Sequence, residues 1–123
     1  MNAHAIVNRL LETANVRTYY HVTQGSRAAS IRSTGLLPKI EKRGIRASEK
    51  APAVYFFDSL DTAEDALTNW LADEYPESES KAVVFAAELN STELQPDPEL
   101  AGSFILFRAV KPDELREVTS FEL

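Results

Sequence analysis

Apolar residues spaced three or four positions apart predict a helix at the beginning of the chain. They are Ala3, Ile6, Val7, Leu10, Leu11 and Ala14. This spacing gathers apolar side chains on one face of a helix and leaves the other face polar. We expect residues 1–16 to form a helix that packs on the rest of the protein.

Several shorter segments have the composition of β-strands, which are rich in β-branched and aromatic residues. They cover residues 18–23, 53–57, 82–87, 104–107 and 115–121. The segment 82–87 is apolar at every position, so we expect a strand that is buried on both faces.

Polar residues at the ends of segments predict two more helices. Ser26 is placed to cap a short helix that runs through Thr34 and ends at Gly35. Asp58 and Ser59 are placed to cap an amphipathic helix further along the chain, whose apolar positions are Leu60, Ala63, Ala66, Leu67, Trp70 and Leu71.

Two segments lack a regular pattern and are predicted to be loops. Residues 36–51 form a connection longer than most in compact domains, which favours a binding loop or a lid. Residues 90–102 are rich in proline and acidic side chains. The pattern as a whole predicts an α+β fold with about five strands and two main helices, in one domain that spans residues 1–123.

The composition excludes several classes of site. The chain has no cysteine, so neither a disulfide framework nor a thiolate metal site is available. His4 and His21 are too far apart in sequence for a recognisable metal-binding pattern, and no glycine-rich phosphate loop is present. No stretch approaches membrane-spanning length. We therefore expect a bacterial or phage-type cytoplasmic protein without a metal site or a membrane partner.

The net charge of -6 disfavours general binding to nucleic acids, because a phosphate backbone repels an acidic protein. Basic residues nevertheless concentrate in one window, where only Glu41 and Glu49 oppose them. They are Lys39, Lys42, Arg43, Arg46 and Lys50. This window is either a local anion site, a surface for a protein partner, or a solvated charged loop.

Three segments, taken in order, resemble the motifs of the ADP-ribosyltransferase superfamily. Residues 20–23, Tyr-His-Val-Thr, resemble the first motif, in which an aromatic-His-x-Thr strand precedes a short helix that ends near a glycine, here Gly35. Residues 54–57 and the helix that follows them resemble the second motif, a strand that carries tyrosine. Residues 102–107 resemble the third motif, a strand that usually begins with glutamate. The combination is closest to the diphtheria-toxin-like and poly-ADP-ribose-polymerase-like branch, the His-Tyr-Glu class.

This resemblance implies a split, strongly bent mixed β-sheet with NAD bound as a co-substrate in a helix-flanked cleft between its halves. His21 would hydrogen-bond the adenosine-side ribose, and Thr23 would support the same wall. Tyr55 would place its ring against the nicotinamide. Arg43 and Arg46 would bind the pyrophosphate through paired charge-assisted hydrogen bonds.

The same residues also have purely structural interpretations. A histidine in a strand is often half-buried, with its ring satisfied by the backbone. Strand alternation requires at least one of Tyr55, Phe56 and Phe57 to be part of the core. The ordered combination of three motifs is what favours the functional interpretation of His21 and Tyr55.

The third motif departs from the family pattern, because Ser103 stands where the glutamate is expected. A serine can bond to a ribose hydroxyl, but it brings no negative charge to an oxocarbenium-like transition state. An acid from another segment would have to replace it, with Glu49, Glu88 and Glu99 as candidates, or the acceptor would supply a carboxylate. The alternative is a domain that binds the nucleotide without transferring it.

The sequence therefore predicts an NAD-dependent mono-ADP-ribosyltransferase of toxin or effector type, acting on a protein or another macromolecule. Its catalytic residues would be His21, Tyr55 and Ser103. The alternative is a degenerate domain that binds NAD, ADP-ribose or a protein partner. An RNA 2′-phosphotransferase, which shares the superfamily fold, is less favoured because the overall charge is acidic. Such an enzyme depends on a set of Arg and His residues that this chain supplies only in part, with Arg17, Arg32, Arg43, Arg46 and Arg108.

Overall fold

The computed structural model describes residues 15–39 and 51–123. The predicted helix at residues 1–16 falls almost entirely outside these residues, and Arg43 and Arg46 also lie outside them. At its last positions the helix prediction is wrong, because Asn15 belongs to a turn and Val16 begins the first strand.

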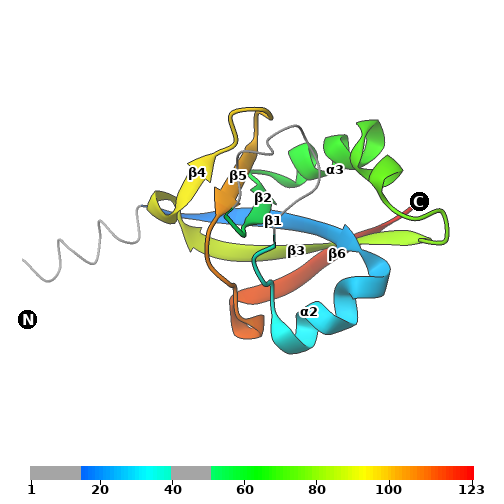
Figure 1. Cartoon of the computed structure of the whole chain (residues 1–123), viewed down its shortest axis with the longest axis horizontal. Helices are drawn as coiled ribbons and strands as arrows, with labels where there is room; N and C mark the ends of the chain where they lie inside the picture. Colours follow the sequence, from blue (N-terminus) through cyan, green and yellow to red (C-terminus); the bar gives the residue numbers. More distant parts are fainter. Residues whose placement is uncertain (1–14, 40–50) are drawn as a thin grey trace, which may run out of the picture.

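The described residues form six strands and two α-helices, so the predicted α+β class is confirmed. The strands are β1 Val16–Gln24, β2 Val54–Phe57, β3 Lys81–Asn90, β4 Leu94–Pro96, β5 Ser103–Leu106 and β6 Leu115–Glu122. The helices are α2 Ala28–Thr34 and α3 Leu60–Asn69 (Figure 1). Single 3-10 turns occur at Gly25–Arg27, Leu71–Glu74, Ser91–Glu93 and Pro112–Glu114.

All strands belong to one sheet in the order β4-β5-β2-β1-β3-β6. β1 pairs with β3 along its whole length, from Val16 opposite Asn90 to Gln24 opposite Ala82. On its other side, β1 pairs with β2 only at one position, where Tyr20 lies opposite Phe57. The sheet therefore consists of two halves, β4-β5-β2 and β1-β3-β6, that meet at one residue pair.

Every strand pair in the described sheet is antiparallel, so the predicted mixed sheet is wrong in this respect. The reason lies in the strand order. β2 and β3 run in the same direction and are connected through α3, which is the usual arrangement for a parallel pair. β1 lies between them and pairs antiparallel with both, so the two parallel strands are not neighbours.

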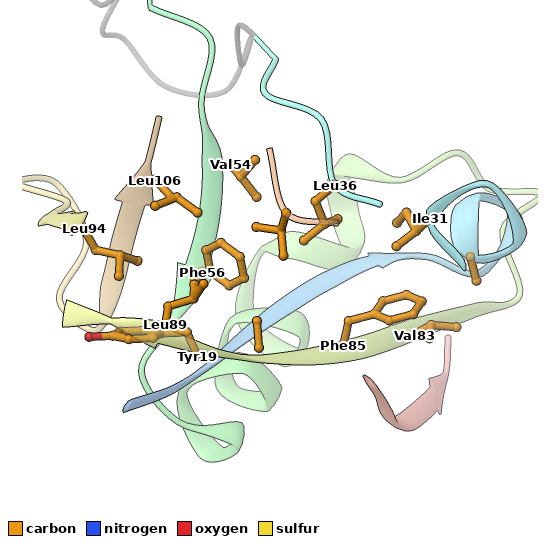
Figure 2. Packing of buried hydrophobic residues seen from close by; sticks show 13 residues of the cluster. Tyr19, Ile31, Leu36, Val54, Phe56, Val83, Phe85, Leu89, Leu94 and Leu106 are labelled. Carbon is orange, nitrogen blue, oxygen red and sulfur yellow. The ribbon is translucent and has the colours of Figure 1, made fainter. Parts of the chain in front are cut away.

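A first core cluster fills the angle between the two halves of the sheet, where β2 and β5 run steeply across β1 and β3 (Figure 2). Phe56 is completely buried at its centre. Figure 2 shows Phe56 and Phe85 pointing into this interior, with Ile31 of α2 and Leu36 closing it on one side. Side-chain packing, rather than a backbone ladder, thus joins the two halves.

A second cluster lies on the opposite face of the sheet, where α3 covers Val22, Phe57 and Val84. α3 contributes Ala63, Ala66 and Leu67 to it. Because β3 supplies residues to both clusters, residues 82–87 are all buried, as predicted. No helix among the described residues is long and apolar enough to span a membrane.

The helix ends agree with the sequence at two of three positions. Ser59 Oγ accepts a hydrogen bond from the Thr62 amide at 3.0 Å, which confirms the predicted cap of α3. Gly35 ends α2 with a φ of 81°, and a side chain there would collide with the Val110 carbonyl oxygen. The predicted cap by Ser26 is wrong, because its hydroxyl donates to Glu79 Oε2 at 2.7 Å instead.

Both ends of the predicted long loop are tied to the domain. Leu36 forms a backbone bridge with Val110, and Lys39 forms one with Ala53. The segment 90–102, predicted to be a loop, contains β4, whose three residues pair with β5. A three-residue strand that ends in Pro96 is too short to produce an alternating pattern.

Glu88 is an exposed residue of β3 that connects three strands. It accepts hydrogen bonds from the Thr18 hydroxyl of β1 and from Arg116 of β6, each at 2.7 Å. The hydrogen bond from Thr18 and that from Arg116 lower the pKa of Glu88. The ionised form is therefore stabilised in the folded protein relative to the unfolded chain.

Replacement of Phe56 by alanine should lower the free energy of unfolding by about 3–5 kcal/mol, because it leaves a cavity between the two halves of the sheet. Urea unfolding measures this change. Phe107→Ala is the matched control, since 47% of Phe107 is exposed and its loss should cost far less. Equal costs for the two variants would contradict the role of Phe56 in joining the halves.

Glu88 should add stability at neutral pH that disappears in acid. A lowered folded-state pKa means that this contribution is present above the unfolded-state pKa, about 4.3, and is lost as the pH falls through the lower folded-state value. A double-mutant cycle with Glu88→Gln and Arg116→Leu should thus give favourable coupling at pH 7 that declines below about pH 4. Coupling that does not change with pH would show that the ionised carboxylate is not responsible.

Candidate functional site

The two halves of the sheet separate immediately after the Tyr20 and Phe57 pair. His21, Val22, Thr23 and Gln24 continue to pair with β3. The β2 residues that would face them, Phe56 and those before it, pair only with β5. This separation begins at the first motif and leaves one edge of β1 without a strand partner among the described residues.

His21 lies where β1 and β2 begin to separate. Its ring nitrogen Nδ1 is 2.8 Å from the backbone carbonyl oxygen of Tyr55, and its ring contacts that of Phe56 edge-on, with centroids 5.8 Å apart. A carbonyl oxygen only accepts hydrogen bonds, so Nδ1 must carry the hydrogen. In the neutral ring, Nε2 is then the acceptor.

Thr23 lies on the same face of β1 as His21, as the two-residue spacing predicts. It is buried, with 6% of its surface exposed. This face belongs to the first core cluster through Tyr19 and Val83. Thr23 therefore contributes to the wall behind His21 rather than to an open surface.

Tyr55 and Ser103 share the opposite face of the sheet. Phe57 lies directly opposite Ser103, and Tyr55 lies directly opposite Ile105, so all four side chains are on one side. Tyr55 is half-buried, whereas Phe56 and Phe57 are both core residues. His21 thus meets Tyr55 through its backbone carbonyl, while the side chains of Tyr55 and Ser103 occupy the other face.

Ser103 is more enclosed than a substrate-contacting serine would be. Only 2% of its surface is exposed, and its hydroxyl oxygen has no hydrogen-bond partner among the described residues. Its backbone is held on both sides, because its amide donates to the Leu100 carbonyl and its carbonyl accepts from the Asp97 amide. The neighbouring Gly102 lies close to the side chains of Asp58 and Thr62.

The candidate acids and arginines are distributed over the molecule. Glu88 is bound to Thr18 and Arg116, and its position opposite Thr18 puts it on the other face of the sheet from His21. Glu99 lies in the turn before β5, where its amide donates to Asp97 Oδ1 at 2.9 Å. Glu49 lies outside the described residues.

The described arginines do not form a cluster. Arg32 pairs with Glu117, and Arg108 pairs with Glu93. The hydrogen bond to Glu93 is the main reason that the pKa of Arg108 is raised. Within residues 15–39 and 51–123, no group of three or more His, Cys, Asp or Glu side chains is arranged to hold a metal ion.

The structure also contains a cavity that no sequence motif indicates. A cavity of about 470 Å³ lies on the other side of the Tyr20 and Phe57 pair, where β2 ends and β1 continues back to Val16. We call it the notch. Asp58 and Ser59 line it, although their sequence context indicates only a helix cap. Tertiary contact with β1 and Phe104 of β5 is what makes it a cavity.

Replacement of Ser103 by alanine should raise the free energy of unfolding by about 1 kcal/mol, because a buried hydroxyl without a partner is unfavourable. Ser59→Ala is the matched control and should lower it by about 1 kcal/mol through loss of the α3 cap. Urea unfolding of both variants measures the contrast. Destabilisation by Ser103→Ala would mean that the hydroxyl has a partner, such as a buried water molecule.

Comparison with known proteins identifies no family for this chain. No family model matches it, and no curated protein or solved structure matches it. The function must therefore be inferred from the geometry of the chain and from the motifs in its sequence.

Proposed function

We propose that this domain is an NAD-dependent mono-ADP-ribosyltransferase that binds NAD where β1 and β2 separate. One observation carries the proposal: the ladder between β1 and β2 ends beside His21 after a single residue pair. A split sheet is the feature that the resemblance to the ADP-ribosyltransferase superfamily implies. The separation coincides with the first two motifs, which supports their joint role in one site.

The hydrogen-bonding state of His21 suits a ribose. Because Nδ1 donates to the Tyr55 carbonyl, Nε2 is the acceptor nitrogen of the neutral ring. A ribose hydroxyl can donate to such a nitrogen. The contact with Phe56 and the bond to Tyr55 restrict the orientation of the ring, so little side-chain entropy would be lost on binding.

The edge of β1 beside His21, before the buried Val22 and Thr23, is a second candidate element of recognition. A strand edge presents both N–H donors and C=O acceptors. The carboxamide of nicotinamide has one group of each kind, so it could bond to such an edge as a short additional strand would. The half-buried ring of Tyr55 lies on the other face of the sheet, so the proposal gives it no contact with a nucleotide bound beside His21.

Transfer requires more than recognition. The bond between the ribose C1′ and the nicotinamide nitrogen must break, with the electron pair leaving on nicotinamide. The acceptor's nucleophile then bonds to C1′ and releases its proton. Ser103 is uncharged and enclosed, so it would stabilise the cationic sugar poorly. Loss of such a charge commonly costs about a hundredfold to a thousandfold in rate.

The burial of Ser103 favours a second candidate function, which is binding of NAD or ADP-ribose without transfer. Both functions use the same opening of the sheet and the same His21. They differ in whether ADP-ribose is transferred. Transfer would need an acid, contributed either by the acceptor or by a segment outside the described residues.

The test combines NAD titration with an assay for released nicotinamide. The unaltered chain should bind NAD in a saturable manner, and His21→Ala should weaken binding by about tenfold, the effect of one lost hydrogen bond in a polar site. His4→Ala, which changes the only other histidine in the sequence, is the matched control.

The outcomes separate the alternatives. Nicotinamide release that depends on His21 supports the transferase, and saturable binding without release supports the binding domain. An absence of NAD and ADP-ribose binding at millimolar concentration would overturn both. Equal effects of the His21 and His4 substitutions would remove His21 from the site.

A further inference from the structure

The two edges of the described sheet differ in how they are protected from pairing with another chain. β4 and β6 are its outermost strands (Figure 1). β4 has only three residues and ends in Pro96, and both properties are common protections of a sheet edge. β6 has eight residues and contains no proline. Among the described residues it pairs only with β3, so its other side is an open edge.

The first part of β6 is protected by charged side chains and by an irregularity. Arg116 is bound to Glu88 at 2.7 Å. Glu117 is bound to Arg32 at the same distance of 2.7 Å, so both charged side chains of this part are tied to their own fold. Val118 is an extra residue without a counterpart on β3, and such a bulge bends a strand. Regular pairing with another chain is therefore confined to the residues that follow Val118.

The residues after the bulge present a regular edge. The Leu123 amide donates to the Ser80 carbonyl at 3.0 Å, so the backbone groups of Leu123 face β3. Backbone groups of successive strand residues point to alternate sides, so those of Phe121 also face β3. Those of Ser120 and Glu122 face outward, and both of these residues are exposed. The edge thus offers the N–H and C=O groups of two residues.

This edge is complementary to a second copy of itself. When two copies run antiparallel with Ser120 of each opposite Glu122 of the other, every outward N–H group meets an outward C=O group. A two-fold axis then passes between the Phe121 residues of the two copies. The Thr119 hydroxyl lies 3.5 Å from the Ser120 carbonyl oxygen and does not block it, because a carbonyl oxygen accepts two hydrogen bonds.

The charges and the aromatic residue of this segment suit the same register. Glu122 is the only charged residue within 119–123, and it faces Ser120 of the other copy rather than a second glutamate. Lys81 lies directly opposite Glu122 on β3 and offsets its charge within each copy. Phe121, which packs against the second core cluster, meets its counterpart in the type of pair that brings side chains closest together.

We propose that the outer edge of β6 pairs antiparallel with a second copy of this chain through residues 119–123. A standard interface has about 20–30 residues a side, so a contact of this length gives a dimer that dissociates on dilution. β1 and β3 lie between β6 and β2 in the sheet. The pairing goes beyond the proposed binding of NAD and does not depend on it.

Sedimentation equilibrium of the full chain tests the proposal. At up to about 1 mM protein, where a Kd of about 1 mM is still measurable, monomer and dimer should be in reversible equilibrium. Ser120→Pro should weaken association about tenfold or more, because proline lacks the outward N–H group. Ser120→Ala is the matched control, since it keeps that group and should associate like the unaltered chain.

Two results of this experiment would overturn the proposal. A chain that remains monomeric at about 1 mM does not pair with its own copy, and the open edge would then suit a strand of another protein. Equal association of the proline and alanine variants would place the contact between copies elsewhere on the surface.

Single cysteines test the register, because the chain has no cysteine of its own. Phe121→Cys places two thiols across the two-fold axis with Cα atoms about 4.5 Å apart, which suits a disulfide. Oxidised glutathione should therefore link this variant into a dimer. Thr119→Cys is the matched control, because its two copies would lie more than about 7 Å apart and should remain unlinked. Equal linking of both variants would overturn the register, and this test holds even if Ser120→Pro fails to fold.

Discussion

The rest of the structure depends on the position of β1 between two strands, of which only β3 pairs with it along its whole length. Nine residues of β1 follow β3, whereas one residue pair connects it to β2. A full ladder on one side sets the twist and direction of β1. The four residues of β2 follow β5 instead, and so the two halves of the sheet diverge on either side of Tyr20 and Phe57. The opening at His21 and the notch are the two consequences.

Because backbone bonds contribute so little at this junction, side chains hold the halves together. Phe56 contacts the rings of both Tyr19 and His21, and it is fully buried. The proposed nucleotide-binding histidine is therefore also part of the packing that joins the two halves. A site built in this way has a rigid wall, and its orientation depends on the integrity of the core.

Ser103 shows how packing limits chemistry. It pairs with Phe57 in the ladder next to the junction, yet its side chain is buried. A glutamate at this position would need room and solvation that the present packing does not offer. The burial of Ser103 therefore weighs against the proposed transfer and not against the proposed binding of NAD, as does the replacement of glutamate by serine in the sequence.

The sequence by itself determined most of the local structure. Composition and periodicity predicted five of the six strands, the buried character of β3, the cap at Ser59 and the end of α2 at Gly35, because these depend on neighbouring residues. The helix cap predicted at Ser26 is wrong for a tertiary reason, because the Ser26 hydroxyl donates to Glu79 from a distant segment.

Only the tertiary structure decided how the elements combine. No local pattern specifies that β1 separates β2 from β3, which removes parallel pairs and opens the sheet at His21. Likewise, the notch gathers Arg17, Asp58 and Phe104 from three segments whose proximity depends on long-range pairing. Which side chains share a face depends on register, and register results from the packing of the whole sheet.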